Sequence, residues 1–143
     1  MEDHRVEFVR PAGLYPGAPY SYAAVAPPGG LVFTAGACPL SRDGVVVGPG
    51  DFETQARQAV ANLLATLEAA GTGAGDVVKA TVYVVTASQD DLVGVWAVVK
   101  AAFEPFEPPC TLLGVAMLGY TDQLVEIEAV ALAPPPSEPA PSP

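Results

Sequence analysis

Positive charge is scarce in this chain, and the scarcity limits the partners it can bind. Only 6 Lys and Arg residues stand against 16 Asp and Glu residues, so the formal net charge is −10. A nucleic acid would meet a repulsive electrostatic field and almost no cationic contacts. We therefore expect no nucleic-acid partner.

Side chains that bind metals or activate nucleophiles are also few. The only histidine is His4, near the first residue, so neither a Ser-His-Asp nor a Cys-His arrangement has a well-placed base. The two cysteines, Cys38 and Cys110, do not form a zinc-ligand spacing. No Gly-rich loop carries the Lys-Ser/Thr pair that binds phosphate. We expect neither a metal nor a cofactor.

Long hydrophobic runs are absent as well. Gly, Pro or charged residues interrupt each apolar stretch well before the roughly 20 residues that a membrane helix requires. The first residues lack the charged-then-apolar pattern of a secretion signal, and the cysteines indicate no structural disulfide. These features predict a soluble protein of the reducing cytoplasm with no membrane partner.

What the chain does contain is enough apolar sequence for one domain. Half of the residues are hydrophobic and 15% are charged, which favours a compact core and some further burial through oligomerisation. We expect a single domain over residues 1–133. Residues 134–143 (PPPSEPAPSP) are too rich in proline for a helix or a strand and predict an extended, disordered tail.

Hydrophobic periodicity predicts two helices among short strands. The first helix opens at Asp51 and stops at Gly71, and the second runs from Ser88 or Gln89 to Phe103. The proline- and glycine-containing residues 27–30 have the composition of a hairpin turn. Strands are expected at residues 6–9, 20–26, 31–38 and 77–85 and twice within 108–133, and residues 45–47 are a candidate for a further short strand.

This order of elements predicts an α+β fold in which both helices cover one face of a mixed six-stranded sheet. The other face of the sheet is left without a cover. Apolar side chains on such a face must be hidden from water, so self-association through it is the simplest solution.

Two acids interrupt the apolar run of the last predicted strand. Glu126 and Glu128 alternate with Val125, Ile127 and Ala129. Because strand side chains have a period of two, both carboxylates point to one face, about 7 Å apart. A carboxylate on an interior face must be compensated or used, so Glu126 is either catalytic or bonded to backbone or a tyrosine. Glu128 is expected to be structural or solvated.

Over residues 17–131 the sequence resembles the RidA/YjgF/UK114 family of small trimeric proteins, several of which hydrolyse reactive enamines and imines. The resemblance rests on several stretches in the family's order: Ala18-Pro19-Tyr20-Ser21, Leu31-Val32-Phe33-Thr34-Ala35-Gly36, Gln55-Ala56-Arg57-Gln58-Ala59 with Asn62-Leu63, Ala69-Ala70-Gly71, Asp76-Val77-Val78-Lys79-Ala80-Thr81-Val82-Tyr83-Val84 and Val125-Glu126-Ile127-Glu128-Ala129. The resemblance implies a chorismate-mutase-like fold, a homotrimer around a central barrel of sheets, and a pocket in each cleft between subunits.

The resemblance also implies roles for particular residues. In deaminating members a Glu on the last strand positions the attacking water, and this role falls on Glu126. Those members bind the substrate carboxylate with an Arg in a Pro-x-Arg-Ser/Thr element. Cys110 aligns with this Arg, between Pro109 and Thr111, if one additional residue is allowed near Gly119. Ala35 stands where many members have a Ser, and Ala37 replaces their Gln.

The cleft implied by this alignment is less suited to anions than that of the deaminating members. An Arg binds a carboxylate through two charged hydrogen bonds, whereas a thiol is a weak donor. We therefore expect a larger or less anionic small-molecule substrate. The catalytic residues would be Glu126 and Cys110, and the substrate-binding residues Tyr20, Ala35, Gly36, Trp96, Thr111 and Tyr120.

Several alternatives remain open. Cys110 is either a nucleophile or a small residue of the pocket wall, Tyr20 is pocket wall or core, and Trp96 on its helical stripe is core unless the alignment places it in the pocket. The favoured function is hydrolysis or deamination of an imine- or enamine-like metabolite. The alternative is a non-catalytic trimer that binds a small molecule as a sensor, carrier or accessory of a biosynthetic pathway. A ribonuclease or translation-inhibitor function, attached to some relatives, is disfavoured by the acidic charge.

Overall fold

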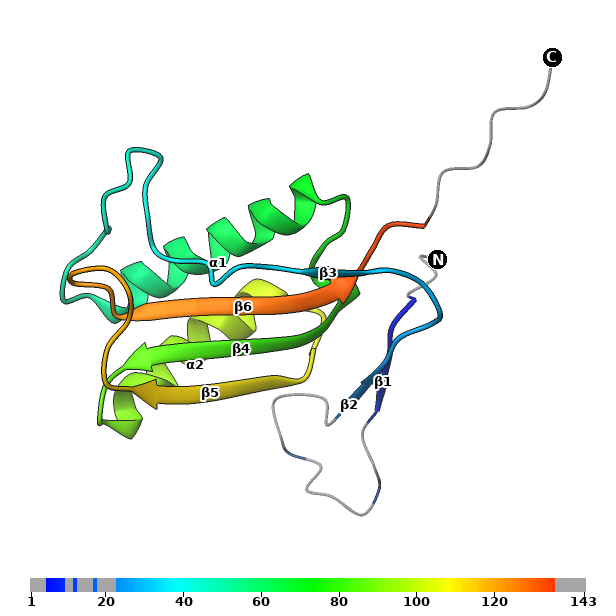
Figure 1. The fold of residues 1–143 in the computed structure, drawn as a ribbon. Coiled ribbons are helices and arrows are strands. Elements are labelled where there is room, and N and C mark those ends of the chain that lie inside the picture. The colour runs from blue at the N-terminus through cyan, green and yellow to red at the C-terminus, as the bar shows by residue number, and fades with distance from the viewer. Residues whose placement is uncertain (1–4, 10–11, 13–16, 18–22, 136–143) are drawn as a thin grey trace.

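The computed structural model describes residues 5–9, 12, 17 and 23–135, and these form a helical layer packed on a sheet (Figure 1). Helices α1 (Phe52–Ala69) and α2 (Gln89–Phe103) lie side by side on one face of the sheet. The opposite face has no covering element among the described residues. The predicted α+β class, with two helices on one face, is confirmed.

The strands form two sheets rather than a single one. The larger sheet is mixed: its order is β3-β6-β4-β5, with β4 parallel to β5 and the other pairs antiparallel. The smaller sheet pairs β1 with β2, so the hairpin expected across residues 27–30 does not form. Two consecutive prolines in that link lack the N–H groups that a continued ladder needs. The strands are β1 (Glu7–Val9), β2 (Ala23–Val25), β3 (Leu31–Phe33), β4 (Val77–Val85), β5 (Cys110–Val115) and β6 (Val125–Leu132).

Strand β3 is shorter than the predicted residues 31–38 because a side chain interrupts its ladder. The amide of Ala129 donates to the Thr34 hydroxyl at 3.0 Å instead of to a backbone carbonyl. The chain then leaves the ladder and meets β6 again at Ala37, which forms a bridge with Ile127. The segment between Thr34 and Ala37 places Gly36 against the side chain of Glu126 on β6. The possible strand at residues 45–47 contributes only one bridge, between Leu40 and Val46.

Both helices begin and end where their sequences predict. Asp51 caps α1 by accepting a hydrogen bond from the Thr54 amide at 3.1 Å, and this bond lowers the pKa of Asp51. Gly71 follows the helix with φ 82°, a conformation that favours glycine. Helix α2 starts after Ser88, and Pro105 prevents its continuation. A short 3₁₀ turn, η1 (Ala74–Asp76), leads into β4.

The core lies between the helices and the sheet. It is almost entirely aliphatic, which agrees with the stripes predicted from helical and strand periodicity. Its main buried members are Ala56, Ala59, Val60, Leu63 and Leu67 of α1; Val95, Val99 and Phe103 of α2; and Val77, Ala80, Val82, Val84, Val125, Ile127, Ala129 and Ala131 of the sheet.

Gln55 is a polar residue within this core, with no exposed surface. Its amide nitrogen donates to the carbonyls of Gly48 at 3.2 Å and Asp122 at 2.9 Å, and its oxygen accepts from the Leu124 amide at 2.6 Å. One side chain of α1 therefore ties the loop before α1 to the loop before β6. A buried amide with all of these bonds made is stabilising, but each bond lost leaves a buried group unpaired.

None of the described helices combines the length and the apolarity that are needed to cross a bilayer.

We predict that Gln55→Met lowers the free energy of unfolding by roughly 2–3 kcal/mol, because it keeps the volume but leaves backbone groups of both loops unpaired. Denaturant unfolding at fixed protein concentration measures the change. The matched control is Arg57→Ala on the same helix, which removes only an exposed ion pair with Glu53 and should cost less than about 0.5 kcal/mol. Equal effects of the two variants would contradict the structural role of Gln55.

Candidate functional site

The carboxylate of Glu126 lies on the face of the sheet away from the helices. Its strand neighbours Val125 and Ile127 are buried beneath the helical layer, so the alternation of β6 turns Glu126 to the other side. There it stands opposite Tyr83 of β4. Glu126 is neither buried in the core nor fully exposed.

Two donors hold one oxygen of this carboxylate. Oε1 of Glu126 accepts a hydrogen bond from the thiol of Cys38 at 3.1 Å and from the side-chain amide of Gln123 at 3.2 Å. Oε2 lies against Gly36, where an added Cβ would come within 2.3 Å of it. Within the described part of the chain no donor reaches Oε2. Among the described residues, the carboxylate is therefore held through Oε1 and receives no donor at Oε2.

The segment that carries Gly36 and Cys38 is anchored to both layers. Ala37 exchanges backbone hydrogen bonds with Ile127 of β6, at 2.7 and 3.1 Å. From α1, the amide of Asn62 donates to the carbonyls of Cys38 at 2.8 Å and Leu40 at 3.0 Å. Helix and sheet thus jointly set the position of the Cys38 thiol.

The loop that leads into β6 is held in the same way. Gln123 is nearly fully buried, and besides Glu126 its amide donates to the Val125 carbonyl at 3.1 Å. Its oxygen accepts from the backbone amide of Tyr120 at 3.1 Å. The side chain of Tyr120 is itself half exposed, at 50%. Tyr120 therefore approaches the Glu126 site through its backbone.

Glu128 has a different environment although it shares the face of Glu126. Its carboxylate accepts a hydrogen bond from the Tyr83 hydroxyl. This bond raises the pKa of Tyr83, because losing the phenolic proton would place a second negative charge beside the carboxylate. Glu128 thus has a structural partner, which agrees with the structural role expected for it.

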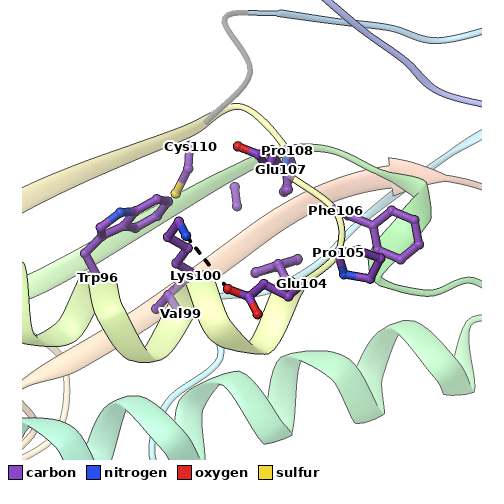
Figure 2. A pocket seen from close by; sticks show the side chains of 11 residues that line it. Trp96, Val99, Lys100, Glu104, Pro105, Phe106, Glu107, Pro108 and Cys110 are labelled. Atoms are coloured by element: carbon purple, nitrogen blue, oxygen red, sulfur yellow. Dashed lines mark ion pairs between the residues drawn. The ribbon is translucent and has the colours of Figure 1, made fainter. Parts of the chain in front are cut away.

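Cys110 lies on the helix side of the sheet. It pairs with Ala80, a core residue of β4, and packs between the edge strand β5 and α2. Its thiol lines a cavity of about 190 Å³ together with Trp96 and Val99 of α2 (Figure 2). Lys100 and Glu104 form an ion pair at 3.8 Å beside this cavity. Residues 105–108 complete its wall.

The Cys110 thiol is not activated as a nucleophile. Burial raises its pKa to about 11, and the positive charge of Lys79 offsets only part of this effect. Because the thiolate is the reactive form, Cys110 is a protonated, weakly polar group at neutral pH. Of the two roles left open for this residue, a wall of the cavity fits this environment better.

Within one protomer the expected site residues fall into two groups. Gly36 and Glu126 come together on the open face, and Cys110 and Trp96 come together on the helix face. Thr111 is exposed on the open face, where its hydroxyl accepts a hydrogen bond from Lys79 at 2.6 Å. Ala35 lies beside Gly36 in the segment that crosses β6. Tyr20 lies outside the described residues.

Two residues at this site were not anticipated from the sequence. The sequence makes Cys38 a candidate only for zinc or disulfide chemistry, and no motif in it singles out Gln123. The available signals were weak: Cys38 follows Gly36 by two residues, and Gln123 precedes Glu126 by three. No group of three or more His, Cys, Asp or Glu side chains that could bind a metal occurs among the described residues.

Comparison with known proteins places these observations in a family. The family model described as Endoribonuclease L-PSP matches residues 11–133. The RutC family protein UK114 of Drosophila melanogaster is 38% identical over 117 residues, which span 82% of this chain and 81% of the relative. The 2-iminobutanoate/2-iminopropanoate deaminase of Escherichia coli K12 is 36% identical over 112 residues, which span 73% and 80%.

Solved structures give the same result for the fold. The Rid family protein YyfB of Yersinia pestis, described as of unknown function, superposes with a TM-score of 0.84 at 32% identity, over 90% of this chain and 98% of that one. Escherichia coli TdcF with bound serine superposes with a TM-score of 0.65 at 28% identity, over 93% and 97%. The expected RidA/YjgF fold is confirmed, and the chain belongs to the RidA/YjgF/UK114 family.

Proposed function

We propose that this protein hydrolyses an imine- or enamine-like metabolite, releasing ammonia, and that Glu126 is the general base. The observation that carries the proposal is the geometry of the Glu126 carboxylate: Oε1 is held by two donors, and Oε2 lies against Gly36 and receives no donor from the described residues. The names of relatives such as the Escherichia coli deaminase support the same class of reaction.

The proposed chemistry needs one water and one group that handles protons. As the water oxygen attacks the carbon of the C=N bond, Oε2 of Glu126 accepts a proton from that water. The same carboxyl group returns this proton to the nitrogen, which gives a carbinolamine. Oε2 then accepts the proton of the new hydroxyl group as the C=O bond forms and transfers it to the nitrogen as the C–N bond breaks. The products are a carbonyl compound and ammonia.

The active assembly is proposed to be a homotrimer with a site shared between neighbouring subunits. The open face of the sheet exposes Phe33 at 72%, Leu31 at 44% and Leu113 at 42%, and self-association would hide these side chains. Since Cys110 and Glu126 face opposite sides within a protomer, a cleft that contains both needs a second copy. Because Cys110 lies on the edge strand β5, the cleft would form where this edge of one copy meets Glu126 of the next.

The substrate is expected to be less anionic than a simple 2-imino acid. The cavity is lined by Trp96, Val99 and Phe103 together with the paired Lys100 and Glu104, and Cys110 contributes a protonated thiol instead of a guanidinium. Such a wall binds an apolar group and offers no fork of donors for a carboxylate.

A second candidate is a non-catalytic trimer that binds a small molecule in the same cleft. It is favoured by the unactivated thiol of Cys110 and by the serine bound to the structural relative TdcF. An RNA substrate, suggested by the name of the family model, is disfavoured by the net charge of −10.

We predict that Glu126→Gln reduces ammonia release from freshly generated imines by about 10²–10⁴-fold, because the amide cannot accept the proton. The assay compares the variant with wild type and with imine hydrolysis in buffer. The control is Glu128→Gln, two residues along the same face, which keeps an acceptor for Tyr83 and should retain activity within about threefold. If wild type consumes none of the imines or enamines faster than buffer does, the non-catalytic candidate replaces the enzymatic one.

We predict that Cys110→Arg raises kcat/KM for 2-imino acids by about tenfold or more, because a bidentate guanidinium is restored. Cys110→Lys is the matched control, since it adds the charge without the fork and should gain less. Thermal unfolding of each variant establishes that the larger side chain is tolerated. A folded Cys110→Arg variant with unchanged substrate preference would contradict the pocket alignment.

We predict that two inactive variants complement each other when co-expressed. Protomers carrying Glu126→Ala lack the base, and protomers carrying Cys110→Phe have a filled cavity. In a mixed trimer one of three clefts combines an intact Glu126 with an intact cavity, so about one third of the activity per trimer should return. Purification through two different affinity tags selects the mixed species. Inactive mixed trimers would show that each site lies within one protomer.

A further inference from the structure

We infer that Cys38 is a positioning residue for Glu126: its thiol holds Oε1, so that Oε2 is the oxygen presented to water. The inference rests on the proposed role of Glu126 and adds a residue that the proposed function does not use. Cys38 touches neither substrate nor water in this proposal and acts through the carboxylate.

The contacts define the role of the thiol. Both hydrogen bonds to Glu126, from Cys38 at 3.1 Å and from Gln123 at 3.2 Å, end on Oε1. An oxygen with both lone pairs occupied by donors is poorly able to take a proton from water. Oε2 lies over Gly36, whose missing side chain leaves the oxygen its place. The arrangement thus distinguishes the two oxygens of one carboxylate.

The thiol can hold the carboxylate because its own backbone does not move freely. The adjoining residue Ala37 is bonded to Ile127, the neighbour of Glu126 on β6. On the other side Asn62 fixes the Cys38 carbonyl and receives a hydrogen bond from Gln58 at 2.9 Å. The segment of Cys38, the donor, is bonded to β6, and Glu126, the acceptor, belongs to β6. The shared strand therefore keeps the distance between thiol and carboxylate fixed.

The protonation state of Cys38 suits a donor. Burial, the hydrogen bond to Glu126 and the negative charge of Glu126 together raise its pKa to about 11, while the amide of Gln123 acts in the opposite direction. Glu126 is the titratable group facing the thiol among the described residues. The thiol therefore keeps its proton near neutral pH and is neither a nucleophile nor readily oxidised.

Kinetics of two variants test the positioning role. Cys38→Ala removes the donor and should lower kcat by roughly 5- to 10-fold with little change in KM, because the carboxylate rotates away while the substrate wall is intact. Cys38→Ser keeps an O–H donor and should restore kcat to within about threefold of wild type. Undiminished kcat in Cys38→Ala, or a serine variant as slow as the alanine variant, would overturn the inference.

A second measurement does not require turnover. In a Cys110→Ala background, the pH dependence of iodoacetamide alkylation reports the pKa of Cys38 alone. Glu126→Gln should shift this pKa downward, because the thiolate no longer forms beside a carboxylate. The matched control is Cys110 in a Cys38→Ala background, whose pKa is raised by burial and should not respond to Glu126→Gln.

The two measurements separate the inference from the proposed function. If the alkylation pKa of Cys38 does not move on Glu126→Gln, the thiol does not hold the carboxylate and the inference fails, whatever the activity. If that pKa moves but wild type consumes no imine, the proposed function fails and the hydrogen bond between Cys38 and Glu126 is supported.

Discussion

The alternation of side chains along β6 is the constraint on which the rest of the structure depends. This strand lies between β3 and β4, and its residues Val125, Ile127 and Ala129 contribute to the core. Glu126 and Glu128 must therefore face away from the helices, since an unpaired carboxylate in the core would cost several kcal/mol. The loop at Gly36 and the ladder to β4 then supply the two acids with different neighbours, one a thiol and an amide, the other a phenol.

Local patterns predicted the elements well, and long-range pairing was harder to predict. The helix from Asp51 to Gly71 and the strand at residues 77–85 follow directly from periodicity and capping, which act within a few residues. The division into two sheets depends on which strand finds which partner, and a turn composition such as that of residues 27–30 does not decide it. Thr34 shortened β3 through a bond to a residue 95 positions away.

In the candidate site, too, local patterns were predictable from the sequence and long-range contacts were not. A period of two predicted that Glu126 and Glu128 share one face of the sheet, and the structure places that face away from the helices. The Glu126 donors Cys38 and Gln123 come from separate loops, so their convergence required the three-dimensional arrangement. The resemblance placed Cys110 opposite Glu126, and the register with Ala80 turns Cys110 to the other side of its own sheet. Cys110 and Glu126 can therefore share one cleft, as the resemblance implies, only if they come from different copies of the chain.

The fully buried Gln55 links the mobility of two loops to that of the first helix. Because one amide side chain fastens the segment before α1 and the segment before β6, neither segment can loosen without disturbing the first helix. Glu126 lies two residues after Leu124, whose backbone amide donates to Gln55. The geometry of the carboxylate is thus linked to the packing of α1, and we expect the acid to keep its position as long as this helix stays packed.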